Sequence, residues 1–132
     1  MPDINGFAVI AAAIAAFALG GIWYSPLLFG KVWQREAGVS DDAIRSSNMV
    51  LVFGGAFALT LLASAVFALF LGPKPGLAFA AGAGAAAGIA WVAAAFGINY
   101  LFERKSLTLF AINGGYNAVM FTVIGLFLGL WH

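Results

Sequence analysis

Five amide and phenol side chains interrupt the apolar segments of the second half of the chain: Asn99, Tyr100, Asn113, Tyr116 and Asn117. Asn113 and Asn117 are four residues apart, so both lie on one face of a helix. At about 1.5 Å per residue they stand roughly 9 and 15 Å from the start of the last apolar run. Asn99 and Tyr100 end the preceding run at a similar depth. The sequence therefore predicts that these residues converge into a polar pocket.

A second interpretation needs no ligand. Asparagine in a membrane span commonly forms a hydrogen bond to a neighbouring helix, which stabilises the contact by about 0.6–2 kcal/mol. Tyrosine and tryptophan at the ends of spans, such as Trp23 and Tyr24, are ordinary interface anchors. No charged residue accompanies the amides, so we favour helix packing over a ligand site.

Groups suited to other chemistry are missing from the sequence. The chain has no cysteine, and its one histidine, His132, stands far from any second metal ligand, so we predict no metal site and no cofactor. No pairing of a nucleophile with a base is visible, which argues against an enzyme. A net charge of +1 gives no reason to expect nucleic acid as a partner.

The elements that position these residues follow from the charge pattern. Only 8% of the 132 residues are charged and 64% are hydrophobic, whereas soluble domains carry about 25% charge. The charges separate four apolar runs, at residues 4–24, 49–71, 77–101 and 107–131. Each is long enough to cross a hydrocarbon core of about 30 Å as a helix. We predict a single all-α integral membrane domain, residues 1–132, of four transmembrane helices in a bundle.

The basic residues predict the orientation. Lys31, Arg35, Arg45, Arg104 and Lys105 lie in the first and third loops, and only Lys74 lies in the second. By the positive-inside rule, loops 25–48 and 102–106 are cytoplasmic and both termini lie outside the cell membrane. The first run has no basic residue before it, so we interpret it as a retained span rather than a secretory signal.

The two halves of the chain share short patterns. Gly-Ile-Trp-Tyr ends the first run and Gly-Ile-Asn-Tyr ends the third, while a Gly-Gly pair stands near the start of the second and fourth runs. This favours two parallel helical-hairpin repeats, with chance recurrence of common residues as the alternative. The first loop is longer than the third. Its residues 27–35 predict an interfacial segment, and Ser40 predicts the N-cap of a helix that continues into the second span.

Small residues recur at intervals of four in two of the spans: Ala8, Ala12, Ala16 and Gly20 in the first, and Ala80, Gly84 and Gly88 in the third. Such rows let helix backbones approach closely, which drives association within lipid. We therefore expect the first and third spans at the centre of the bundle and the bulkier second and fourth spans toward lipid. A homo-oligomer or a membrane-protein partner would bury more of this surface.

Two long stretches resemble a known family. They are INGFAVIAAAIAAFALGGIWYSPLLFGKVWQ and GINYLFERKSLTLFAINGGYNAVMFTVIGLFLGLW, with residues 20–26, Phe29-Gly30, Trp33 and 99–104 as the most specific parts. Together with the four runs, they resemble a bacterial family of small four-span membrane proteins known as a domain of unknown function. The resemblance implies a fold and a bacterial inner-membrane location, and it brings no activity or catalytic residue.

Two functions remain open at this level. The first is a non-catalytic helix-packing, accessory or assembly protein, favoured by the rows of small residues and the lack of ionisable groups within the spans. The alternative is a small oligomeric channel or transporter for a neutral or weakly polar solute, favoured by the amide and tyrosine cluster. Whether that cluster lines a cavity or joins helices distinguishes them.

Overall fold

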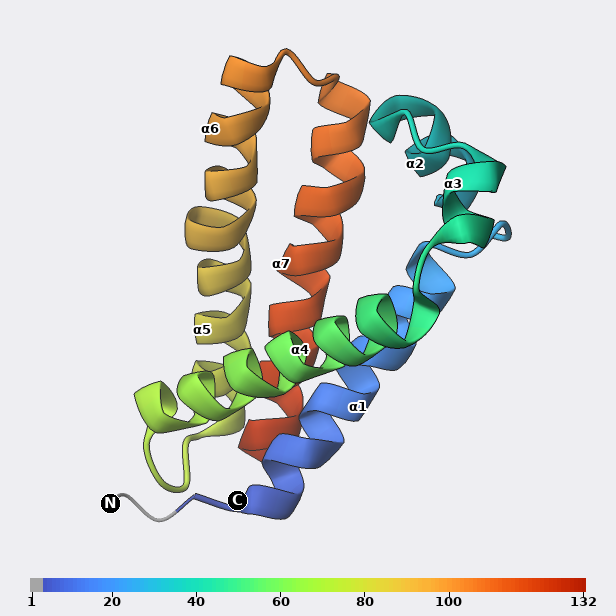
Figure 1. The fold of residues 1–132 in the computed structure, drawn as a ribbon. Helices are drawn as coiled ribbons and strands as arrows, with labels where there is room; N and C mark the ends of the chain where they lie inside the picture. The colour runs from blue at the N-terminus through green and yellow to red at the C-terminus, as the bar shows by residue number, and fades with distance from the viewer. Residues whose placement is uncertain (1–3) are drawn as a thin grey trace.

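The computed structural model describes residues 4–132, and every regular element in that part of the chain is a helix (Figure 1). The elements in chain order are α1 (Gly6–Trp23), α2 (Gly30–Ala37), α3 (Asp41–Ser46), α4 (Met49–Leu71), α5 (Leu77–Ala86), the π-helical segment η1 (Ala87–Ala93), α6 (Ala94–Glu103) and α7 (Leu107–Leu130).

Four helical stretches are long and apolar enough to cross a membrane: α1, α4, the continuous run α5–η1–α6 (Leu77–Glu103), and α7. The predicted all-α, four-span fold is confirmed. The start of α1 and the end of α7 lie at one end of the bundle (Figure 1). The other end carries α2, α3 and the α6–α7 turn, and we call it the basic end because five of the six basic residues belong to it.

Side-chain caps fix where three of the four spans begin, whereas the third span starts after Gly76 without one. Asn5 accepts a hydrogen bond from the backbone N–H of Ala8, Asn48 from that of Leu51, and Ser106 from that of Leu109, at 3.0–3.2 Å. Each cap satisfies a backbone donor that the first turn of a helix leaves unpaired. The charge-free runs thus become helices with defined starts.

The centre of the bundle is α7, which corrects the expectation that the first and third spans would occupy it. Helix α1 packs on one side of α7 and the α5–η1–α6 run packs on another, with little direct contact between the two. The rows of small residues indicated close approach but not the partner. Helix α7 offers its own glycines, Gly125 and Gly129, to receive the third span.

Contacts between the third span and α7 are made backbone to backbone. A Cβ added to Gly84 would overlap the carbonyl of Phe121, and one added to Gly88 would stand 2.7 Å from the carbonyl oxygen of Asn117. Ala80, one turn before, is fully buried. These three positions have room for little or no side chain, because α7 lies directly against them.

The small residues of α1 also lie in contact surfaces. Ala8, Ala12 and Ala16 are fully buried within the core cluster, and a Cβ on Gly20 would meet the hydroxyl of Tyr116 at 2.9 Å. Bulky residues of α7, among them Ile124, fill the space beside the alanines. The first span is thus held along its length by α7.

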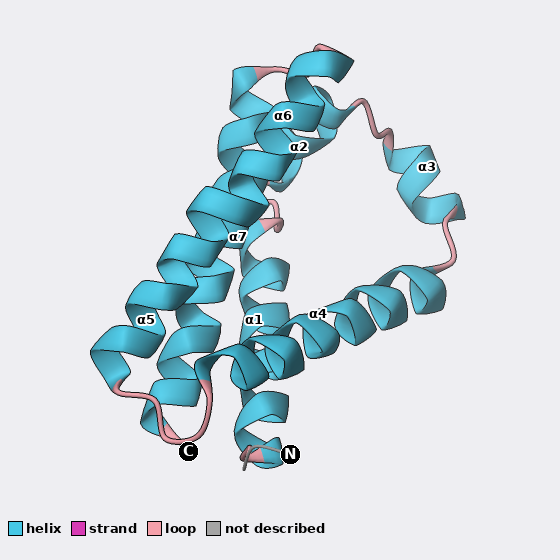
Figure 2. Ribbon diagram, turned by 90° about the vertical axis from the view of Figure 1, so that its left-hand side faces the viewer, coloured by secondary structure: helices cyan, strands magenta, loops and turns pink. Residues whose placement is uncertain are grey.

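Helix α4 is packed quite differently from α7, although the sequence grouped them as lipid-facing. It runs across the bundle and mainly contacts α1 (Figures 1 and 2). Only Ser64, Phe67 and Ala68 of α4 are buried, all in its second half. The two hairpins that share sequence patterns are therefore packed in different ways, since only the second is closed along its whole length.

The expected continuous helix from Ser40 into the second span is also corrected. The hydroxyl of Ser40 accepts a hydrogen bond from Ala43 N as predicted, but α3 ends at Ser46. Ser47 is extended, and Asn48 caps a new helix. Because Asn48 satisfies the first turn of α4 by itself, the chain can change direction between the two helices.

We predict that Gly84→Ala destabilises the protein. Its new methyl group would overlap the Phe121 carbonyl, so the third span must move away from α7, at a cost of about 1–3 kcal/mol in free energy of unfolding. Unfolding in mixed detergent with increasing sodium dodecyl sulfate measures this free energy. Gly82→Ala is the matched control, because a Cβ there meets no atom within 4 Å. Equal stability of the two variants would contradict the packing described.

Candidate functional site

A chain of hydrogen bonds joins three spans at the basic end. The hydroxyl of Tyr24, at the end of α1, donates to Asn113 Oδ1 of α7 at 2.6 Å. The other end of that amide, Asn113 Nδ2, donates to the hydroxyl oxygen of Tyr100 on α6 at 2.6 Å. One asparagine thus bridges two tyrosines from opposite sides of α7. We call these three residues the asparagine bridge.

Two more side chains reach across to backbone carbonyls. Trp23 Nε1 donates to the carbonyl of Ile112 at 3.0 Å, and the hydroxyl of Tyr116 donates to the carbonyl of Ala16 at 3.1 Å. The first bond runs from α1 to α7 and the second from α7 to α1. The two helices are therefore tied in both directions, and on α7 both bonds lie within about one turn of Asn113.

Aromatic rings enclose these polar groups. Tyr24 meets Tyr116 edge to face, with ring centroids 5.4 Å apart, and meets Trp33 of α2 in the same way at 5.8 Å. Trp23 packs on Phe29 with centroids 4.9 Å apart. Such pairs stabilise a fold by about 0.5–1.5 kcal/mol beyond their buried area. Through Trp33, helix α2 becomes part of the same assembly.

Glycines make room for these rings. A Cβ on Gly20 would meet the Tyr116 hydroxyl, and one on Gly115 would stand 3.3 Å from the Trp23 ring. Gly30 starts α2 and donates its N–H to the carbonyl of Ser25 at 3.0 Å. A side chain at Gly30 would overlap the backbone of Tyr24. Close approach thus requires glycine at positions 20, 30 and 115, whereas Gly21 faces open space.

The five residues predicted to form a pocket are only partly brought together. Tyr100 and Asn113 belong to the asparagine bridge, and Tyr116 lies against Tyr24. Asn117 Nδ2 turns back to the carbonyl of Asn113 in its own helix at 2.8 Å. Asn99 is exposed and forms none of the side-chain hydrogen bonds found within residues 4–132.

Sequence reasoning gave Trp33 no place in this cluster. It assigned the residue to an interfacial segment of the first loop, and that segment does form the short helix α2. What brings Trp33 against Tyr24 is the turn at 24–30, where Phe29 N donates to the carbonyl of Trp23 at 3.0 Å. No spacing rule in the sequence signals that reversal.

The polar side chains of the cluster bond to one another or to backbone carbonyls of the spans. No buried side-chain nitrogen or oxygen within residues 4–132 lacks a hydrogen-bond partner. The same part of the chain contains no group of three or more His, Cys, Asp and Glu residues that could hold a metal ion. Chemically, this arrangement suits the joining of helices, because the hydrogen bonds that would orient a ligand already connect spans.

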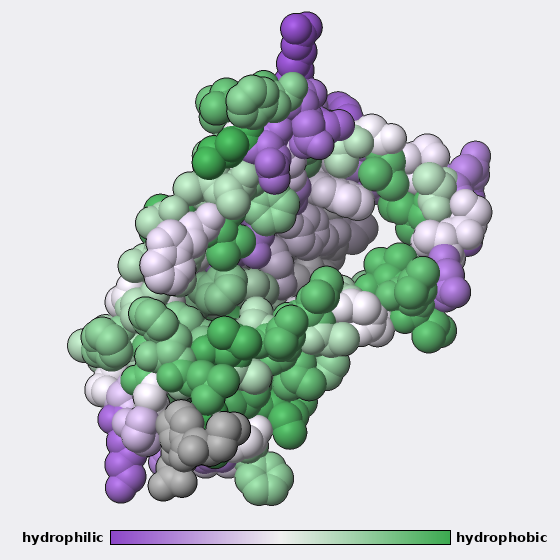
Figure 3. All heavy atoms as spheres, turned by 60° about the vertical axis from the view of Figure 1, so that its left-hand side comes forward, coloured by the Kyte–Doolittle hydropathy of each residue, from purple (hydrophilic) through white to green (hydrophobic). Residues whose placement is uncertain are grey.

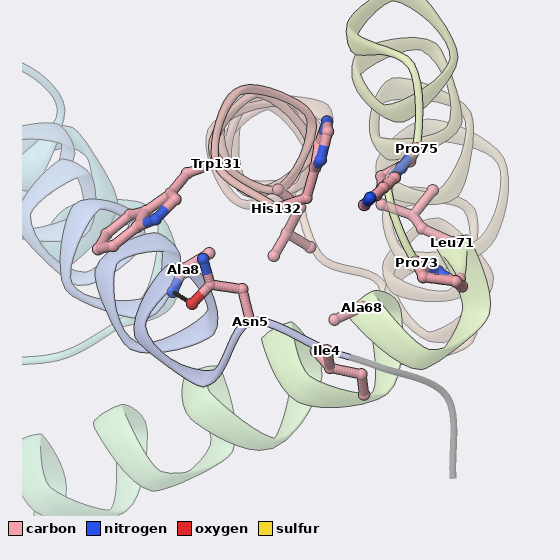
Figure 4. Close-up of a pocket in the computed structure, with 12 residues that line it drawn as sticks. Ile4, Asn5, Ala8, Ala68, Leu71, Pro73, Pro75, Trp131 and His132 are labelled. Atoms are coloured by element: carbon pink, nitrogen blue, oxygen red, sulfur yellow. Dashed lines mark hydrogen bonds between the residues drawn. The ribbon is translucent and has the colours of Figure 1, made fainter.

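Two cavities lie away from the asparagine bridge. One of about 300 Å³ lies where the start of α1, the α4–α5 connection and the end of α7 meet (Figure 4). Asn5, on its wall, already caps α1. The other, a shallow hollow of about 470 Å³, lies against α2 and the start of α3, between Lys31 and Asp41. None of the asparagine-bridge residues lines either cavity.

We predict that Asn113→Leu lowers the free energy of unfolding by about 1–3 kcal/mol, because it leaves the hydroxyls of Tyr24 and Tyr100 without their partner. Asn99→Leu is the matched control at similar depth and should change it by less than about 0.5 kcal/mol. Detergent unfolding followed by circular dichroism measures both. Similar losses in the two variants would show that the bridge has no special part in stability.

Comparisons with known proteins place the chain in a family. The family profile described as Protein of unknown function (DUF1761) matches residues 7–129, nearly the whole chain. No curated protein matches the chain. No solved structure matches it either. The family resemblance noted in the sequence is confirmed: this protein belongs to the DUF1761 family, whose members are proteins of unknown function.

Proposed function

We propose that this protein is a non-catalytic helix-packing protein that works as an assembly or accessory subunit within a lipid bilayer. The observation that carries the proposal is the asparagine bridge, in which Asn113 bonds to Tyr24 on one side and Tyr100 on the other. These amide and phenol groups thereby hold α1, α6 and α7 together. A rigid bundle of this kind is suited to presenting its outer surface to another membrane protein.

A channel or transporter is the competing function. A path for a neutral solute needs polar groups that can exchange their partners for the solute. In the bridge, both ends of the Asn113 amide are engaged at 2.6 Å. Tyr116 is bonded to Ala16 and Asn117 to its own helix. These hydrogen bonds favour packing over transport.

Catalysis is disfavoured on similar grounds. The polar groups of the cluster are amides, phenols and an indole, which supply no base or activated nucleophile near neutral pH.

The proposal also includes the orientation expected from the basic residues, with the basic end facing the cytoplasm and both termini outside a bacterial inner membrane.

Native mass spectrometry of the protein extracted in membrane nanodiscs tests this function. We predict that the 13.7 kDa chain is found in a stoichiometric protein complex, made of further copies, of another membrane protein or of both. A packing subunit must have something to pack against. The appearance of the chain as a monomer alone would contradict the proposal.

A flux assay separates packing from transport. Proteoliposomes that contain the protein should shrink and reswell in glycerol or urea at the rate of empty liposomes. Faster flux that Asn113→Leu abolishes and Asn99→Leu preserves would favour the channel instead. The two variants alter one amide each at similar depth, so a difference between them reports on the bridge.

A further inference from the structure

The third span contains a π-helical segment in its middle. Within residues 4–132 it is the one segment of this kind, and it joins α5 to α6 at Ala87–Ala93. At its end, the N–H of Ala94 points to the carbonyl oxygens of Trp91 and Ile89, the second of them five residues earlier. An α-helix bonds residues four apart, so a π-helical turn holds one extra residue. Such turns are rare, and this one needs a physical reason.

Before η1, the third span touches α7 through every fourth residue. Ala80 is fully buried, Gly84 lies against the carbonyl of Phe121, and Gly88 lies against the carbonyl of Asn117. This interval is the one expected of an α-helix that presents a single face. The facing positions on α7 are also four apart: Gly125, Phe121 and Asn117.

After Gly88, the next contact comes five residues later. Ala93 is buried, and a Cβ on Gly114 of α7 would stand 3.3 Å from its Cβ. Gly97 follows at the usual interval of four, against the ring of Phe110. Along α7 the facing positions still advance by four. The row of small residues that the sequence analysis ended at Gly88 therefore continues past η1, with one interval of five.

An unbroken α-helix would present different residues to α7. Five residues turn an α-helix by about 500°, roughly 140° beyond one full turn, so Ala93 would face away from α7 whenever Gly88 faced it. Val92, four residues after Gly88, would take the place of Ala93. Seven residues further on, Asn99 would take the place of Tyr100. The extra residue thus decides which of these two polar side chains meets the α7 asparagine.

We infer that η1 is a one-residue register step, whose extra residue turns α6 so that Tyr100 faces Asn113. The side of η1 away from α7 is exposed, with Ile89 at 59% and Trp91 at 65%. Figure 3 shows mostly apolar side chains on the sides of the bundle between its hydrophilic ends. This inference goes beyond the proposed function, because it concerns how the chain positions its bridge, whatever the bundle packs against.

Deletion of Ala90, an exposed residue of η1, tests the step. The third span has 27 residues, so it stays longer than the roughly 20 that cross a bilayer. Removing one residue should convert the interval of five into four and leave Tyr100 in place. Removing both Ile89 and Ala90 should turn Tyr100 away by about 100°. If η1 were no step, the single deletion would already cause that rotation.

A cysteine pair reads the register directly, because the chain has no cysteine of its own. Ala93→Cys combined with Gly114→Cys places two Cβ atoms 3.3 Å apart, close to the about 3.5–4.5 Å of a disulfide. In membranes oxidised with copper phenanthroline, the disulfide within one chain should form in the full-length protein and after deletion of Ala90. It should be lost after the double deletion. Peptide mass spectrometry of the monomer band identifies it.

Unfolding in increasing sodium dodecyl sulfate is the second measurement. The chain without Ala90 should unfold at the same detergent concentration as the wild type or a higher one, and the double deletion at a lower one. Deletion of Val119 is the matched control. Val119 is an exposed residue of α7, which has no π-helical turn to absorb the change, so its loss should also lower that concentration.

The outcomes decide the inference independently of the proposed function. Loss of the disulfide after the single deletion, or its retention after the double deletion, would overturn the register step. Equal unfolding of the variants that lack Ala90 and Val119 would overturn it as well. Both readouts come from a single chain, so a protein that is monomeric in nanodiscs would contradict the packing function and leave this inference standing.

Discussion

Close backbone contact around α7 is the constraint on which the rest of this structure depends. Within lipid, helices gain no hydrophobic advantage from leaving acyl chains for one another, so they associate through tight packing and hydrogen bonds. Helix α7 receives the glycine face of the third span on one side and the alanine row of α1 on another. A span can pack this closely against two neighbouring helices only if, at each contact, the facing residues on one of the two helices are small. The bundle is built outward from that helix.

The polar cluster at the basic end follows from the same packing. Because α1 and α6 both end beside α7, Tyr24 and Tyr100 arrive on either side of Asn113. Gly20 and Gly115 leave space for the rings of Tyr116 and Trp23. Small residues thus allow the helices to approach, and the amides and phenols then fix how each helix is rotated.

Much of the fold could be predicted from the sequence, because charges mark the ends of spans directly. The packing partners could not, since a row such as Ala8, Ala12 and Ala16 shows that a helix is approached closely but not by which neighbour. The depth of a residue along its span also does not predict which residues it contacts. Asn99 and Tyr100 lie at nearly equal depth, yet only Tyr100 reaches Asn113, because rotation about the helix axis separates adjacent residues by about 100°.

The central claim is that Asn113 holds spans together through its tyrosine partners. A double-mutant cycle with Tyr24→Phe and Asn113→Leu, measured as free energy of unfolding in detergent, tests it most directly. The hydrogen bond between them predicts a coupling energy of about 0.6–2 kcal/mol, so that the double variant loses less than the sum of the single variants. Losses that add within about 0.3 kcal/mol would show that the two side chains act independently, which would contradict the account.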